Sequence, residues 1–140
     1  MKQEVCHGNW LCPRRGWTKL NSDAGWNKDT QQGTTGCIYR SDRREFVGAL
    51  FAQLQFTTSA LVAEAMAIHE GLKLAIEDHW LRLEVESDTK QLIQVLNRHQ
   101  QTPVEIEVVA GDILHLANSL EAKFQYTSRA SNNLAHKIAH

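Results

Sequence analysis

The sequence has few cysteines and no long apolar run. Its three cysteines are an odd and sparse set, which argues against a disulfide framework and suits a reducing compartment. No segment approaches the roughly 18 apolar residues of a membrane span, and the polar opening MKQEVCHGNW lacks the apolar core of a signal peptide. We therefore expect no disulfides, no association with a membrane, and an intracellular protein, either nuclear or cytoplasmic.

A strong charge of one sign is also absent. The 15 basic and 16 acidic side chains nearly cancel, so any binding to a nucleic acid must be local or helped by a partner. The length of 140 residues suits one domain. An apolar fraction of 42 % and a charged fraction of 22 % are those of an ordered globular protein.

The first 16 residues differ in pattern from the rest. They contain CPRRG and show no sustained periodicity, so we interpret residues 1–16 as a leader or linker and residues 17–140 as the domain. Cys6, His7 and Cys12 lie close together in this segment. No second ligand pair follows at zinc-finger spacing, so an ordinary linker is favoured over a zinc site.

Hydrophobic periodicity predicts strands and helices in a defined order. Strands are expected over residues 17–26, 33–40, 44–55, 81–87 and 122–128, and helices over 59–78, 88–98 and 103–120. A short last helix is expected from residue 131, and its truncation is an open alternative. Ser59 suits the N-cap of the first helix. In the strand LRLEVES, leucine and valine alternate with arginine and glutamate, which predicts an apolar face and a polar face. Strands separated by helices need crossover connections, so a mixed sheet covered by helices follows.

Three acids lie where a plain core would not place them. Asp23 falls inside the first strand, although aspartate is disfavoured there. Glu64 lies on the core-facing side of the first helix, three residues after Leu61 and four before Ile68. Asp88 follows the VES strand at the carboxyl edge of the sheet, where α/β folds place their sites. Each acid alone has a structural explanation in a turn, at the solvent edge or as a cap, but together they predict a convergent site.

The chemistry that such a site predicts is metal binding. Neighbouring carboxylates repel one another and raise each other's pKa, which folds tolerate chiefly when a cation lies between them. Oxygen-only ligands favour Mg²⁺ or Mn²⁺ over zinc. Two such ions about 4 Å apart can activate a water and stabilise the leaving oxygen of a phosphodiester displacement.

Four sequence blocks closely resemble, in order and spacing, the signature blocks of type 1 ribonuclease H domains: KLNSDAGW, AEAMAIHEGLKLA, VESDTKQLI and RASNNLAHKIA. They are most similar to the plant ribonuclease-H-like domain related to LINE-type retroelement reverse transcriptases, over about residues 17–140. The resemblance implies the α/β ribonuclease H-like fold, with a five-stranded mixed sheet, its first three strands antiparallel, and helices on both faces. It also implies metal-dependent endonucleolytic cleavage of the RNA strand of RNA–DNA hybrids by a two-metal-ion mechanism.

The resemblance also implies the site residues. Asp23, Glu64 and Asp88 fall on three of the family's four metal-binding acids, as catalytic ligands for two Mg²⁺ ions, for which Mn²⁺ can substitute. At the fourth position the family has aspartate, whereas this chain has His136. Three carboxylates leave two divalent ions short of a negative charge, so the second ion is expected to bind more weakly. A neutral imidazole can still ligate Mn²⁺ or position a water. The opposite interpretation is a surface histidine in a decayed site.

Recognition of a hybrid requires contacts with 2′-hydroxyl groups, largely from backbone and small polar groups. The candidates for substrate contact are Asn21, Ser22 and Thr89, beside the acids, and Asn132, in the last block. The expected partner is the RNA–DNA hybrid itself. A fused or associated nucleic-acid-binding or reverse transcriptase domain is a second expected partner.

Two other interpretations stay open beside the nuclease. One is a catalytically weakened or inactive RNA- or hybrid-binding domain of retroelement origin, which the histidine at position 136 favours. The other is a truncated fragment, because little of the final helix follows Asn133. The intact set of three acids favours the nuclease.

Overall fold

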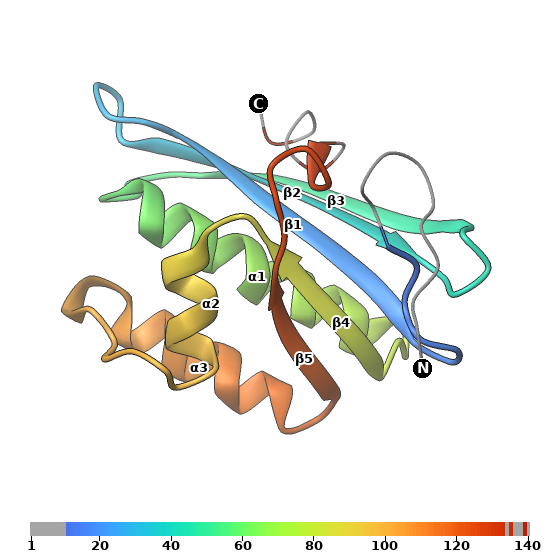
Figure 1. Ribbon diagram of the computed structural model, residues 1–140. Helices are drawn as coiled ribbons and strands as arrows, with labels where there is room; N and C mark the ends of the chain where they lie inside the picture. The colour runs from blue at the N-terminus through green and yellow to red at the C-terminus, as the bar shows by residue number, and fades with distance from the viewer. Residues whose placement is uncertain (1–10, 134, 136–138, 140) are drawn as a thin grey trace.

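The computed structural model describes residues 11–133, 135 and 139, and one five-stranded sheet lies at its centre (Figure 1). The strands are β1 Thr18–Asn27, β2 Gln32–Arg40, β3 Phe46–Leu54, β4 Arg82–Ser87 and β5 Glu121–Tyr126. Their order across the sheet is β3-β2-β1-β4-β5. The first three strands pair antiparallel, whereas β4 pairs parallel with β1 and β5. The predicted mixed sheet is therefore confirmed.

The helices of the described residues are α1 Ala60–Glu77, α2 Lys90–Leu96, the 3₁₀ turn η1 Val104–Ile106, and α3 Glu107–Ala117. The α1 helix begins where predicted, because the Ser59 hydroxyl accepts a hydrogen bond from the Val62 amide at 3.2 Å. The predicted helix over 103–120 is shorter in the structure. It opens as a 3₁₀ turn after Pro103, and the amides of residues 118–120 bond carbonyls three residues back instead of four. None of these helices is long and apolar enough to cross a membrane.

The α1 helix packs closely on β1 and β2. The Tyr39 hydroxyl donates to the Gly71 carbonyl at 2.7 Å, and the Cys37 thiol donates to the Ala67 carbonyl at 3.3 Å. Gly71 is required for this approach, because a Cβ there would lie 2.9 Å from a Leu20 methyl and 3.1 Å from the Cys37 sulfur. The closeness of helix and sheet matters for function, since α1 carries Glu64.

The chain after β5 contacts the opposite face of the sheet. Figure 1 shows α1, α2 and α3 together on one side. Thr34 faces the other side, because it lies an odd number of residues from Cys37 in the same strand. Its hydroxyl donates to the carbonyl of Ala139, and Ala135 and Ala139 are both buried. The last helix, predicted from residue 131, falls mostly outside the described residues.

The segment before β1 lies against the rest of the protein. Cys12 and Pro13 are buried. Cys12 is disulfide-bonded, so the prediction of no disulfides is wrong. An odd number of cysteines excludes a fully paired set but not a single bridge, and Cys37 is free. Cys6 and His7, part of the zinc alternative, fall outside the described residues, and the boundary at residue 16 stays a prediction.

Candidate metal centre

Two of the acids lie where β1 and β4 separate. The ladder between these strands ends at the pair Asn21 and Glu86. Asp23 lies two residues beyond that pair on β1, and Asp88 lies two residues beyond it after β4. Side chains two residues apart in a strand share a face. The end of the ladder therefore brings both carboxylates to one opening.

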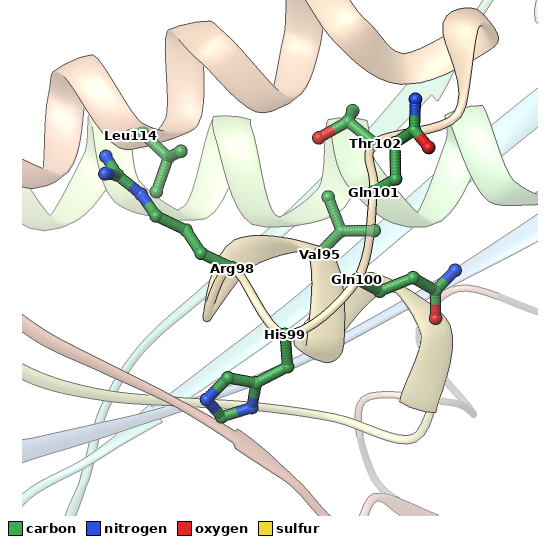
Figure 2. A pocket seen from close by; sticks show the side chains of 7 residues that line it. All are labelled: Val95, Arg98, His99, Gln100, Gln101, Thr102 and Leu114. Carbon is green, nitrogen blue, oxygen red and sulfur yellow. The ribbon is translucent and has the colours of Figure 1, made fainter.

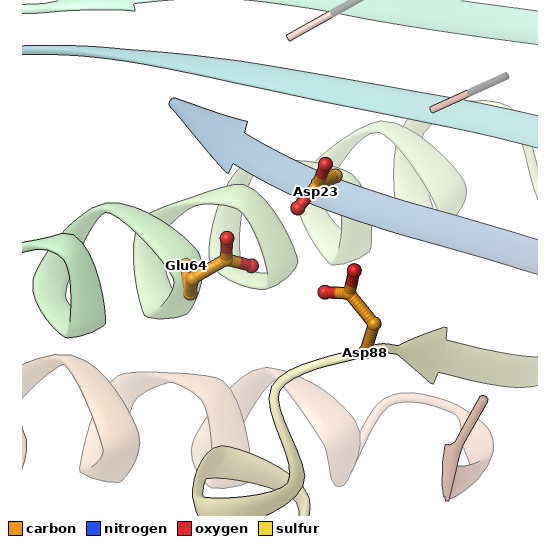
Figure 3. Close-up of side chains that lie close together, drawn as sticks. All are labelled: Asp23, Glu64 and Asp88. Atoms are coloured by element: carbon orange, nitrogen blue, oxygen red, sulfur yellow. The ribbon is translucent and has the colours of Figure 1, made fainter. Parts of the chain in front are cut away.

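Glu64 reaches the same opening from α1. Its Oε1 accepts a hydrogen bond from the Ala24 amide at 3.2 Å. Ala63 and Ala67, on either side of Glu64, pack against Ala24, and these small side chains let the helix lie near β1. One carboxylate oxygen of each of the three acids lies within 4.8 Å of the others. Figure 3 shows the three carboxylates turned toward one another.

The electrostatics of this cluster suit a bound cation. Burial, the negative charge of Asp23 with a hydrogen bond to it, and the charge of Asp88 raise the pKa of Glu64 from 4.5 to about 9, while a hydrogen bond with Thr89 acts in the opposite direction. Glu64 Oε2 is buried and has no hydrogen-bond partner among the described residues. A divalent cation would supply that partner and offset the repulsion, so the residues present fit one. An oxygen-only donor set favours a hard cation over zinc.

The acids line an open pocket of about 350 Å³, together with Ala24, Tyr126 and Arg129. Tyr126 is the last residue of β5 and pairs with Ser87, the residue before Asp88. Arg129 follows in the segment after β5. Tyr126 is not among the site residues predicted from the sequence. Its position at the carboxyl end of a strand beside β4 is the signal that could have found it.

The predicted substrate residues lie in two environments. Thr89 adjoins Asp88 in sequence and acts to lower the pKa of Glu64. Asn21, Ser22 and Asn132 are buried and hydrogen-bonded within the protein. Their contact with a substrate stays a prediction, and it would require those bonds to be shared or exchanged. The predicted fourth position, residue 136, lies outside the described residues.

A second open pocket, of about 570 Å³, shares no lining residue with the acid pocket. Figure 2 shows Arg98, His99 and Gln100 on the loop after α2, beside Val95 and Leu114. This pocket contains no carboxylate. Among the residues that the structure describes, Asp23, Glu64 and Asp88 form the one group of three or more side chains placed to hold a metal ion.

The family of the chain follows from its sequence. A family model described as reverse transcriptase-like matches residues 21–140. The chain belongs to the reverse transcriptase-like family. None of the curated proteins matches it. The matched range of this reverse transcriptase-like domain contains all three acids and the whole sheet except the first residues of β1.

Several solved structures that are similar to this reverse transcriptase-like domain are ribonucleases H. RNase H1 from the halophilic archaeon Halobacterium salinarum NRC-1 has a TM-score of 0.80 and 15 % identity, over 86 % of this chain and 92 % of that one. The N-terminal RNase H domain of rv2228c from Mycobacterium tuberculosis has a TM-score of 0.79 and 15 % identity, over 87 % and 89 %. LC11-RNase H1, in complex with an RNA/DNA hybrid, has a TM-score of 0.75 and 16 % identity, over 86 % and 92 %. At these identities the likeness shows the fold, and the fold is that of ribonuclease H.

Proposed function

We propose that this protein is a divalent-metal-dependent endonuclease that hydrolyses the RNA strand of RNA–DNA hybrids. The observation that carries the proposal is the cluster of Asp23, Glu64 and Asp88, whose oxygens lie within 4.8 Å of one another in an open pocket. A structurally similar protein was solved with an RNA/DNA hybrid, which supports this substrate. Acids at an opening of this size can hold cations and still admit a phosphodiester.

The residues in and behind the pocket are proposed to have different roles. Asp23, Glu64 and Asp88 would hold two Mg²⁺ ions, for which Mn²⁺ can substitute. When bound, such ions supply an activated water and stabilise the leaving oxygen. Arg129 lines the same pocket, and its guanidinium is proposed to bind a phosphate of the strand that is cut. Thr89, and Asn21, Ser22 and Asn132 behind the acids, are proposed to read 2′-hydroxyl groups.

The direct test is cleavage of a hybrid with a labelled RNA strand, in Mg²⁺, in Mn²⁺ and in EDTA. We expect RNA fragments in either metal and none in EDTA. Single-stranded RNA and duplex DNA of the same sequence serve as substrate controls. A folded protein that binds the hybrid but leaves it whole in both metals would favour the hybrid-binding domain instead.

The histidine at position 136 is the observation that favours this second function. If this histidine weakens the binding of the second metal ion, His136→Asp should raise the cleavage rate in Mg²⁺ roughly tenfold. This is within the range of changes in activity that substitutions at metal sites usually cause. The measurement is the initial rate as a function of Mg²⁺ concentration. His99→Asp, at an exposed loop position, is the matched control. An unchanged Mg²⁺ dependence in His136→Asp would mean that residue 136 does not limit the site.

Tyr126 is expected to contact the strand that enters the pocket. Its side chain is 53 % exposed and lies in the pocket wall, so its ring can pack on a ribose. Tyr126→Ala should raise the KM for the hybrid roughly five- to tenfold, and Tyr126→Phe should leave it within about twofold, because the ring is kept. Phe56→Ala, at another exposed aromatic, is the control. Equal KM values for Tyr126→Ala and the wild type would contradict the contact.

A further inference from the structure

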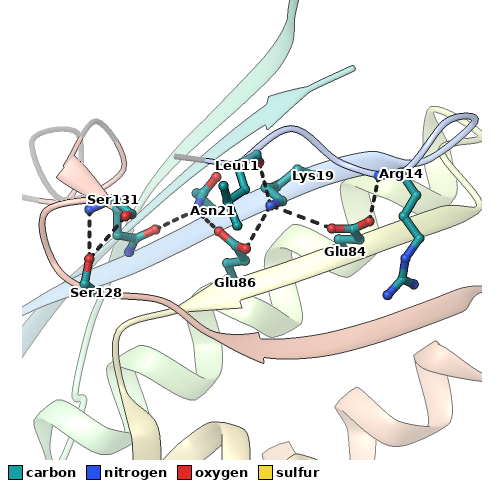
Figure 4. Close-up of polar contacts among 9 residues, drawn as sticks. Leu11, Arg14, Lys19, Asn21, Glu84, Glu86, Ser128 and Ser131 are labelled. Carbon is teal, nitrogen blue, oxygen red and sulfur yellow. Dashed lines mark hydrogen bonds and ion pairs between the residues drawn. The ribbon is translucent and has the colours of Figure 1, made fainter. Parts of the chain in front are cut away.

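A row of buried polar side chains runs along the ladder between β1 and β4 (Figure 4). It lies on the same face of β1 as Asp23, because Lys19, Asn21 and Asp23 are spaced by two residues in this strand. The ladder pairs Lys19 with Glu84 and Asn21 with Glu86. The Lys19 ammonium lies 2.9 Å from Glu86 Oε2 and 3.7 Å from Glu84 Oε1. Lys19 and Glu84 are fully buried. Lysine is among the residues least often found fully buried.

Stability alone does not account for this row. Buried ion pairs are expensive to desolvate, and apolar residues of the same volume often stabilise a fold as well or better. The row does connect distant parts of the chain. At one end the Lys19 ammonium donates to the Leu11 carbonyl at 2.7 Å, and the Arg14 amide donates to Glu84 at 2.9 Å. The segment before β1 is thereby tied to the ladder.

At the other end the row reaches the segment after β5. The Asn21 amide group donates to Glu86 Oε1 at 3.1 Å and to Asn132 Oδ1 at 3.0 Å. The Asn132 amide group donates to the Ser22 carbonyl at 2.7 Å. Asn21, Glu86 and Asn132 are all at least nine-tenths buried. A continuous path of hydrogen bonds therefore joins Lys19 to Asn132.

Asn132 belongs to the arm, defined as residues 127–133, which carries Arg129 to the acid pocket. The Asn132 backbone amide bonds the carbonyls of Ser128 and Arg129, both at 3.1 Å. The arm therefore folds into a turn around Arg129, and the Asn132 side chain fastens that turn to β1. The fastening point, the Ser22 carbonyl, belongs to the residue before Asp23.

We propose that the row Lys19–Glu86–Asn21–Asn132 is a positioning device that anchors the arm, and with it Arg129, beside the metal centre. Lys19 and Glu86 do not line the acid pocket. They act through Asn21, whose amide group they orient by holding the Glu86 carboxylate in place. The catalytic consequence rests on the proposed nuclease function, whereas the anchoring itself does not.

The experiment measures hydrogen–deuterium exchange of the whole protein together with kcat and KM on the hybrid. Lys19→Met removes the cation, and Asn21→Ala breaks the row in the middle while leaving the Lys19–Glu86 pair intact. Both variants should exchange roughly tenfold faster in residues 127–133 than the wild type, with β3 unchanged. In Lys19→Met, whose side chain neither lines the acid pocket nor is proposed to contact substrate, kcat should fall roughly ten- to a hundredfold, with KM changed less than kcat. Lys19→Arg should partly restore the slow exchange of the arm and partly restore kcat. Lys73→Met, which removes an exposed lysine paired with Glu70, is the control.

The outcomes separate the anchoring from the nuclease. If the arm of Asn21→Ala exchanges at the wild-type rate, and β3 does so too, the proposal is overturned. This outcome is decisive even if Lys19→Met does not fold. Faster exchange of the arm with an unchanged kcat would overturn its positioning role. If the arm exchanges faster in the variants but the wild type does not cleave the hybrid, the result would support the anchoring and contradict the proposed nuclease function.

Discussion

Asp23→Asn is expected to abolish cleavage of the RNA–DNA hybrid, with a loss of at least roughly 10²- to 10³-fold. Asp23 is 3 % exposed and lies with the other two acids beyond the end of the β1–β4 ladder. The change to asparagine keeps the size of the side chain but removes a negative charge at the point where cations would bind. The measurement is the rate of appearance of RNA fragments in Mg²⁺ and, separately, in Mn²⁺.

Asp29→Asn is the matched control for this variant, because Asp29 lies exposed in the turn after β1. It should cleave at the wild-type rate. The thermal unfolding midpoint of Asp23→Asn in EDTA should be no lower than that of the wild type, since the change relieves repulsion in the acid cluster. Cleavage by Asp23→Asn at more than about a tenth of the wild-type rate would contradict metal-dependent catalysis at this cluster.

Glu64→Gln should stabilise the metal-free protein increasingly as the pH rises. The pKa of Glu64 is about 9 in the folded protein, against an ordinary 4.5, so between these values the folded state holds a proton that the unfolded state lacks. The free energy of unfolding of the wild type then falls with pH, by up to about 1.4 kcal/mol per pH unit for this group. Glutamine carries no such proton. The variant's advantage should therefore grow from about pH 5 to pH 9 and level off above.

The measurement is denaturant unfolding of both proteins in EDTA across this pH range, followed by the same series in Mn²⁺. The ion should raise the free energy of unfolding of the wild type, most strongly at high pH, because it binds the ionised carboxylate and displaces the proton. The ion should raise the free energy of unfolding of Glu64→Gln far less. Glu77→Gln, an exposed position on the same helix, is the control. A stability difference between wild type and Glu64→Gln that stays constant with pH would show that the Glu64 carboxyl titrates normally.

The sequence predicted the order of the strands and helices because each has a clear period and clear ends. The α1 helix has a serine cap and apolar residues at spacings of three and four, and it begins at the predicted residue. The ends of α3 were less well predicted. The helical period continues through η1 and past Ala117, although the hydrogen bonds there are those of 3₁₀ turns.

The three acids could be selected from sequence because each conflicts with its local setting. The buried row behind them could not. Alternation in LRLEVES assigns Glu84 and Glu86 to the polar face of the strand, yet both are buried. The difference arises because Leu11, Arg14 and Asn132 bond to this face of the ladder from segments far away in sequence. Local patterns carry no information about such covering segments.

The absence of a side chain at residue 71 has a consequence for the width of the metal centre. Gly71 lies seven residues beyond Glu64, about two turns along α1. Even a methyl group there would lie 2.9 Å from a Leu20 methyl and 3.1 Å from the Cys37 sulfur, so these side chains or the helix would have to shift. The spacing between Glu64 and the two strand acids therefore depends on how closely α1 packs on the sheet at the turn that contains Gly71. The proposed cation site therefore depends on the packing of α1 against the sheet as well as on the three carboxylates.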